Sequence, residues 1–213
     1  MNELQFYTTL KLGWLNAWIP ISALILVQLI FMFVFKEGGK RAVDTSWYKP
    51  KDKFYAIISS ILQVAIVLVS LFIPLKSNMV LFITGCIIFV FSFVSSVAAF
   101  YAYGKTPRGE TVRNGIYRLS RNPMYLSFSL GVIATCIATA SLWLLILSIP
   151  FMLAMHGIIL GEERYCTETY GDEYLNYKKQ VARYFGRKRT SDFRLPTSDS
   201  RLPSSVFSLQ SSD

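Results

Sequence analysis

A short polar motif opens a long stretch without acidic or basic residues. The motif, R-N-P-M-Y, covers residues 121–125, and residues 122–161 contain no Asp, Glu, Lys or Arg. Asn122 followed by Pro123 is typical of a helix start, because Asn accepts a hydrogen bond from a free backbone N–H and Pro fits the first turn. Such a helix start beside Arg121 would also attract the carboxylate or phosphate of a cofactor. Tyr117 precedes the motif and Tyr125 is its last residue, so a tyrosine lies on either side of Asn122 and Pro123.

Two adjacent carboxylates, Glu162 and Glu163, end the uncharged stretch. Neighbouring helical residues point about 100° apart, so one glutamate would face a ligand while the other supports the structure. The only histidine, His156, precedes Glu163 by seven residues and shares its helix face, about 10 Å deeper. Such groups could accept a proton in catalysis. The alternatives are a solvated glutamate pair at the membrane surface and a histidine bonded to a nearby carbonyl.

The elements that position these residues are membrane helices. A bilayer is crossed by roughly 20 helical residues, so the stretch is too long for one span and must fold back, with its turn at residues 139–141. Three more apolar stretches precede it. We therefore predict an all-α polytopic protein with a tight hairpin between the fourth and fifth spans and a cytoplasmic C-terminal helix. The five spans cover about residues 14–35, 54–75, 79–103, 123–139 and 142–160.

The distribution of basic residues predicts the orientation of these spans. Twenty of the twenty-two Lys and Arg residues fall in loop 36–53, in loop 105–121 or after residue 163. Because basic residues accumulate in cytoplasmic loops, the N-terminus is expected outside and the C-terminus in the cytoplasm. We predict a multi-pass protein of the cell inner membrane or the endoplasmic reticulum.

Composition sets the domain organisation and excludes some partners. Hydrophobic residues make up 53% of the chain and the net charge is +9. Membrane topology and attraction to anionic lipid headgroups explain this positive charge, so no nucleic-acid partner is expected. No metal site is expected either. Residues 1–185 are predicted to form one membrane domain. Residues 186–213, rich in Ser, Pro, Asp and Arg, are predicted to be a disordered cytoplasmic tail.

Two motifs in this order resemble a known family. N-G-I-Y-R-L-S-R-N-P-M-Y-L begins at residue 114, and G-E-E-R-Y-C-T-E-T-Y-G-D-E-Y-L-N-Y-K-K-Q-V-A-R-Y-F begins at residue 161. They resemble the isoprenylcysteine carboxyl methyltransferase and phospholipid methyltransferase family of membrane enzymes over about residues 105–185. The resemblance implies S-adenosylmethionine as cofactor and a lipid or lipidated acceptor. The cofactor-binding residues that it implies are Gly115, Tyr117, Arg121, Asn122, Pro123, Tyr125, Glu162 and Glu163.

The candidate catalytic residues are Glu163, His156 and Arg121, since an amine acceptor must lose a proton that Glu163 or His156 could take. Asn122 departs from the family, in which many members have His, and this weakens the case for isoprenylcysteine as the acceptor. The leading prediction is an isoprenylcysteine carboxyl O-methyltransferase-like enzyme, and the first alternative is a phospholipid N-methyltransferase. Two further alternatives are an NADPH-dependent membrane sterol or steroid reductase, which the glutamate pair disfavours, and a non-catalytic membrane interaction protein.

Overall fold

The computed structural model describes residues 8, 10–75 and 78–187. Every regular element in these residues is helical, which confirms the all-α prediction. The six α-helices are α1 (Trp18–Val34), α2 (Lys36–Ala42), α3 (Pro50–Ser70), α4 (Met79–Lys105), α5 (Pro123–Thr139) and α6 (Leu142–Gln180), and a short 3-10 helix, η1 (Gly115–Arg118), lies between α4 and α5.

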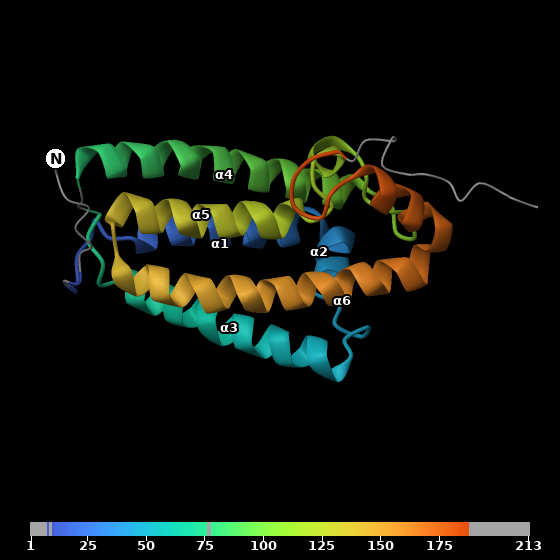
Figure 1. The fold of residues 1–213 in the computed structure, drawn as a ribbon, viewed down its shortest axis with the longest axis horizontal. Coiled ribbons are helices and arrows are strands. Elements are labelled where there is room, and N and C mark those ends of the chain that lie inside the picture. Colours follow the sequence, from blue (N-terminus) through green and yellow to red (C-terminus); the bar gives the residue numbers. More distant parts are fainter. Residues whose placement is uncertain (1–7, 9, 76–77, 188–213) are drawn as a thin grey trace, which may run out of the picture.

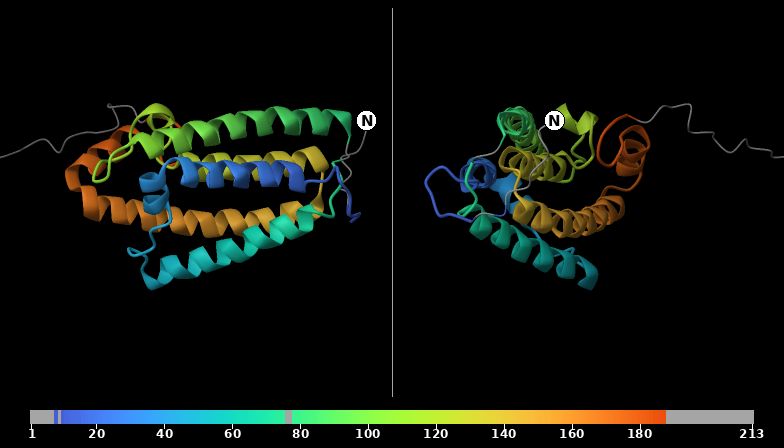
Figure 2. Two further views of the ribbon diagram at one scale, coloured as in Figure 1. Left: turned by 180° about the vertical axis from the view of Figure 1, so that it is seen from behind. Right: turned by 60° about the vertical axis from the view of Figure 1, so that its left-hand side comes forward.

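The five apolar helices run side by side along the long axis of the molecule (Figures 1 and 2). The most extensive packing joins α4 to α5 and α3 to α6, while α1 contacts α3, α4 and α5. The short helix α2 lies at one end of this bundle, near the middle of α6 (Figure 1). The loops between α4 and α5 gather at the same end, so the bundle carries its polar segments there.

Three of the described helices, α3, α4 and α6, are long and apolar enough to cross a membrane. The helices α1 and α5 are apolar but only 17 residues long. Each of the five predicted spans overlaps one of these helices, and the five-span topology stays a prediction. The helix α3 begins four residues before its predicted span, because Pro50 fits the first turn and Asp52 accepts a hydrogen bond from the Lys49 N–H at 2.8 Å.

The sequence predicts a fifth span that ends at residue 160 and a separate C-terminal helix. In the structure both belong to α6, which has no break at residue 160. It continues past residue 160 to Gln180, because charged residues such as Glu162, Glu163 and Arg164 favour helix as well as apolar ones do. Its path changes at Gly171, where φ is 53° and ψ is −128°. The part after Gly171 folds back toward η1 (Figure 1). The predicted tail of residues 186–213 lies outside the described residues except for Gly186 and Arg187.

Candidate active site

The polar motif at residues 121–125 connects η1 to α5. Asn122 occupies the N-cap position and Pro123 the first position of α5, as the sequence predicts. The Asn122 side chain makes no capping hydrogen bond, so that part of the prediction is wrong. Its Nδ2 donates to the carboxylate of Glu163 on α6, which is a charge-assisted hydrogen bond. Gly115, which begins η1, has a φ of 59° that favours glycine.

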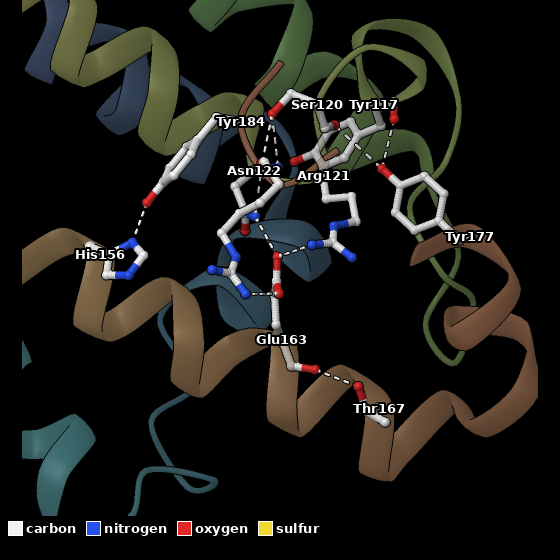
Figure 3. A network of polar contacts seen from close by, with 10 residues as sticks. Tyr117, Ser120, Arg121, Asn122, His156, Glu163, Thr167, Tyr177 and Tyr184 are labelled. Atoms are coloured by element: carbon white, nitrogen blue, oxygen red, sulfur yellow. Dashed lines mark hydrogen bonds and ion pairs between the residues drawn. The ribbon is translucent and has the colours of Figure 1, made fainter. Parts of the chain in front are cut away.

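The carboxylate of Glu163 binds three donors (Figure 3). Arg121 Nη2 and Asn122 Nδ2 each lie 3.0 Å from Oε1, and Arg183 Nη2 lies 3.1 Å from Oε2. The side chains of Arg121 and Glu163 are only 3% and 4% exposed. The three donors satisfy the buried carboxylate of Glu163, which offsets the cost of taking its charge out of water. Glu163 therefore holds the motif, α6 and the chain after α6 together.

Residues 181–187, the return segment, close this network from the C-terminal side. The backbone N–H of Arg121 donates to the carbonyl of Ala182 at 3.1 Å, and that of Gly186 donates to Leu119 at 2.7 Å. The carbonyl of Arg183 accepts hydrogen bonds from the Asn122 amide and from the Ser120 hydroxyl, both at 3.2 Å. The return segment thus fixes the backbone on which Arg121 and Asn122 sit.

A cavity beside the network is lined mainly by tyrosines, and we call it the tyrosine cavity. It lies between the C-terminal end of α4, η1, the start of α5, the second half of α6 and residues 41–48. Its volume, including the open solvent at its mouth, is about 970 Å³. The tyrosines in its wall are Tyr48, Tyr103, Tyr117, Tyr125, Tyr165, Tyr170, Tyr174 and Tyr177.

Buried polar atoms without a hydrogen-bond partner among the described residues gather in this wall. They are Arg41 Nε, Thr111 Oγ1, Tyr117 Oη, Arg121 Nε, Arg121 Nη1 and Glu162 Oε2. Buried polar atoms are nearly always hydrogen-bonded in folded proteins, so a cluster of six in one cavity indicates a polar ligand. The cluster contains both donors and acceptors, and it therefore suits a ligand that carries both charges.

The ionisation state of the wall is set by burial. Burial is the largest cause that raises the pKa of Tyr117 well above its ordinary value, and the negative charge of Glu162 raises it further. The pKa of Tyr48 is raised by the same two causes. Both phenols are therefore neutral at physiological pH and can donate hydrogen bonds. Tyr125 interacts through its hydroxyl with the Glu162 carboxylate.

The residues expected at the site fall into two groups. Tyr117, Arg121, Asn122, Tyr125 and Glu162 line the tyrosine cavity. Gly115, Pro123, Glu163 and His156 are not in its wall. His156 lies on the other side of Glu163 from Tyr177 and bonds the Tyr184 hydroxyl through Nδ1 (Figure 3).

Arg41 lines the same cavity from α2, and nothing in its sequence context singled it out. Its Nη2 donates to the Tyr103 carbonyl at 3.0 Å and its Nη1 to the Pro107 carbonyl at 3.2 Å. Its guanidinium carbon lies 4.0 Å from the centre of the Tyr103 ring. Arg41 belongs to the basic loop 36–53, and membrane topology alone explains the basic residues of such a loop. The sequence therefore did not indicate that Arg41 lines a binding site.

The described residues contain no cluster of three or more His, Cys, Asp or Glu side chains that could hold a metal ion. Residues 75–173 match the model of the phospholipid methyltransferase family, and this match covers α4, η1, α5 and most of α6. Neither a curated protein nor a solved structure matches the chain. The matched residues include both predicted motifs up to Glu173, with the glutamate pair and the tyrosine cavity's Arg121 among them. Over residues 75–173, a little under half of its length, the chain is therefore similar to the phospholipid methyltransferase family.

Proposed function

We propose that this protein is an integral-membrane methyltransferase that uses S-adenosylmethionine to methylate the amine headgroup of a phospholipid-like acceptor. The family match supports a membrane methyltransferase with a lipid-like substrate. The tyrosine cavity supports the rest of the proposal, because its unpartnered polar atoms and its aromatic wall suit a charged ligand with a ring system.

The residues in the wall fit S-adenosylmethionine. Arg121 Nη1, which has no partner among the described residues, would donate a charge-assisted hydrogen bond to its carboxylate. Tyr117 and Thr111 would donate to hydroxyl or ring nitrogen acceptors. The tyrosine faces would lie against the cationic sulfonium and the adenine. When bound, the cofactor supplies an electrophilic methyl group that a nucleophile of the acceptor takes in an in-line displacement.

The position of Glu162 in the cavity wall is the main support for an amine acceptor. It is half-buried in the cavity wall, and its Oε2 atom is buried without a hydrogen-bond partner among the described residues. A carboxylate in such a place attracts an ammonium group and can take the proton that an amine must lose before it attacks. An acceptor carboxylate would meet a like charge there, which is unfavourable at short range in a buried site.

Isoprenylcysteine carboxyl methylation, the leading prediction from the sequence, is the second candidate function. Arg41 and Arg121 favour it, because two arginines in one cavity wall attract an anionic acceptor. A carboxylate acceptor is ionised at neutral pH and would need no base. Glu162 would then have to bind the cofactor rather than the acceptor.

The site's placement in the membrane belongs to the same proposal. We propose that residues 1–185 form a single membrane domain with five spans, the N-terminus outside and the C-terminus in the cytoplasm. The tyrosine cavity would then open near the cytoplasmic surface, where soluble cofactor is available. The lipid acceptor would enter from the adjoining leaflet.

The test is a pair of measurements on the purified protein in lipid nanodiscs. Binding of radiolabelled S-adenosylmethionine is measured first, with NADPH as the competing candidate ligand. Methyl transfer is then measured to phosphatidylethanolamine and to a farnesylated cysteine carboxylate, with Glu162→Gln as the matched variant. Methylated phosphatidylethanolamine that is lost in Glu162→Gln would support the proposal. A base-labile methyl ester on farnesylcysteine would favour the second candidate, and binding of NADPH without S-adenosylmethionine would overturn both.

A further inference from the structure

One wall of the tyrosine cavity comes from a part of the chain outside the family match. Residues 41–48 join α2 to the approach of α3 and contribute Arg41, Asp44, Trp47 and Tyr48 to the cavity. The family match begins only at residue 75. A cofactor common to a family is expected to bind in the part that its members share. Contacts specific to one acceptor are expected outside that part.

Arg41 is held in a fixed position within this wall. Its two Nη atoms donate to the carbonyls of Tyr103 and Pro107, and its guanidinium stacks on the Tyr103 ring. The helix that carries it packs closely on α4, since a Cβ added to Gly38 would lie 3.0 Å from the Cα of Gly104. An arginine fixed in this way loses little side-chain entropy when it binds a ligand. Its Nε is buried and has no partner among the described residues.

The residues between α2 and α3 also contact α6. The rings of Trp47 and Tyr165 stack with their centres 5.2 Å apart and an angle of 16° between their planes. Lys49 Nζ lies 3.1 Å from Glu168 Oε1. Each of these contacts joins the residues before α3 to the helix that carries Glu162. The wall is therefore a built part of the cavity.

Among the charged residues of the cavity wall, Arg41 and Glu162 are a cation on α2 and an anion on α6. Both side chains line the same space, and both keep an atom without a partner. A phospholipid amine headgroup carries the complementary pair, a phosphate and an ammonium group joined by a short linker. Guanidinium groups bind phosphate well, because their N–H donors match the spacing of its oxygens.

We propose that Arg41 binds the phosphate of the acceptor's headgroup, and that residues 41–48 select phosphate-containing acceptors. This inference rests on the proposed function, since it assigns a second contact to the acceptor that Glu162 receives. The oxyanion at Arg41 is the acceptor's phosphate, and the cofactor's carboxylate is assigned to Arg121. Substitution of Arg41 should therefore weaken binding of the acceptor, and substitution of Arg121 should weaken binding of the cofactor.

The test compares two acceptors in three variants. The acceptors are phosphatidylethanolamine and a lipid amine with the same chains, in which an uncharged linker of equal length replaces the phosphate. The variants are Arg41→Gln, which removes the charge, Arg41→Lys, which keeps it, and the control Arg108→Gln. Arg108 is an exposed arginine that pairs only with Glu37 among the described residues, and such surface pairs contribute little.

We expect Arg41→Gln to lower kcat/KM for phosphatidylethanolamine by about 10- to 100-fold, the effect of losing a charge-assisted hydrogen bond. The phosphate-free lipid should be affected much less, Arg41→Lys should recover part of the loss, and Arg108→Gln should behave as wild type. The affinity for S-adenosylmethionine should be unchanged in all three variants. Equal losses for the two lipids would show a structural role and overturn the proposal, as would weaker cofactor binding in Arg41→Gln.

Lipid binding without cofactor separates this inference from the proposed function. Native mass spectrometry of the detergent-solubilised protein measures the preference for phosphatidylethanolamine over the phosphate-free lipid. Loss of this preference in Arg41→Gln supports the inference even if no methyl transfer is found in the wild type. An undiminished preference overturns it even if the enzyme is active.

Discussion

Glu162 and Glu163 are adjacent in the sequence, yet their carboxylates lie in opposite surroundings. Glu163 binds Arg121, Asn122 and Arg183 and is satisfied within the protein. Glu162 lines the tyrosine cavity, and its Oε2 has no partner among the described residues. Neighbouring side chains on a helix diverge by about 100°, so one can face the cavity while the other faces the ion-pair network. The structure thereby divides one motif into a supporting residue and a residue available to a ligand.

The two glutamates should respond differently to the same substitution. Glu163→Gln removes the charge that balances two arginines, and breaking a buried ion pair costs about 3–5 kcal/mol. Thermal unfolding in detergent should therefore show a clearly lower Tm. Glu162→Gln should change the Tm little, because Glu162 is only half-buried, forms no ion pair among the described residues and can keep its hydrogen bond to Tyr125 as glutamine, while methyl transfer falls sharply. A large drop in Tm for Glu162→Gln with normal activity would contradict this division.

Arg121 should contribute to ligand binding through the atoms that Glu163 does not use. Arg121→Lys keeps a positive charge beside Glu163 but lacks the free Nε and Nη1 in the cavity wall. We expect the Kd for S-adenosylmethionine to rise by about 10- to 100-fold, or about 1.5–3 kcal/mol. Arg183→Lys is the matched control, since Arg183 binds the same carboxylate but is not in the wall. Equal increases in Kd for both variants would place the effect in the network and not in a direct contact.

The contact between His156 and Tyr184 provides a test of the catalytic role that the sequence suggested for His156. The pair lies outside the cavity wall and ties α6 to the return segment. If the pair acts only through this bond, His156→Leu and Tyr184→Phe should lower the Tm by similar amounts, and the double variant should be no worse than either. The kcat at saturating substrate should persist. A loss of kcat in His156→Leu that far exceeds the loss in Tyr184→Phe would restore the catalytic assignment.

Gly171 should be required for the fold-back of α6. Its positive φ strains any residue with a Cβ, at a cost of about 1–3 kcal/mol. The turn brings Tyr174 and Tyr177 into the cavity wall. We expect Gly171→Ala to lower the Tm and to weaken binding of S-adenosylmethionine, whereas the exposed neighbour variant Asp172→Ala changes neither. A Gly171→Ala protein with wild-type stability would show that the turn does not need a left-handed residue.

The orientation predicted from the basic residues can be tested by labelling single cysteines in a variant without the three native ones. A membrane-impermeant maleimide should react with Arg108→Cys only after permeabilisation, because residue 108 belongs to a predicted cytoplasmic loop. It should react from outside with Lys76→Cys, at a position outside the described residues. Labelling of Arg108→Cys in sealed cells would reverse the predicted topology.

Much of the architecture could be predicted from the sequence, because it depends on local properties. The limits of α5 and the start of α6 follow from the uncharged stretch, the Asn122–Pro123 start and the small residues before Leu142. The same motifs identified the family that the comparison confirms. The end of α6 was predicted poorly, since a change from apolar to charged residues ends a membrane span without ending a helix.

The arrangement of the site was decided by tertiary structure. The sequence indicated that only one of Glu162 and Glu163 would face a ligand, but the choice depends on the rotation of α6 against the motif and the return segment. Arg41 lines the cavity from a helix about 80 residues before Arg121, and no local sequence pattern indicates that the two residues lie near each other. His156 shares a helix face with Glu163, yet the return segment places Tyr184 against it. Local sequence sets which helices form, and only their packing sets which polar atoms meet, because partners distant in sequence supply the contacts.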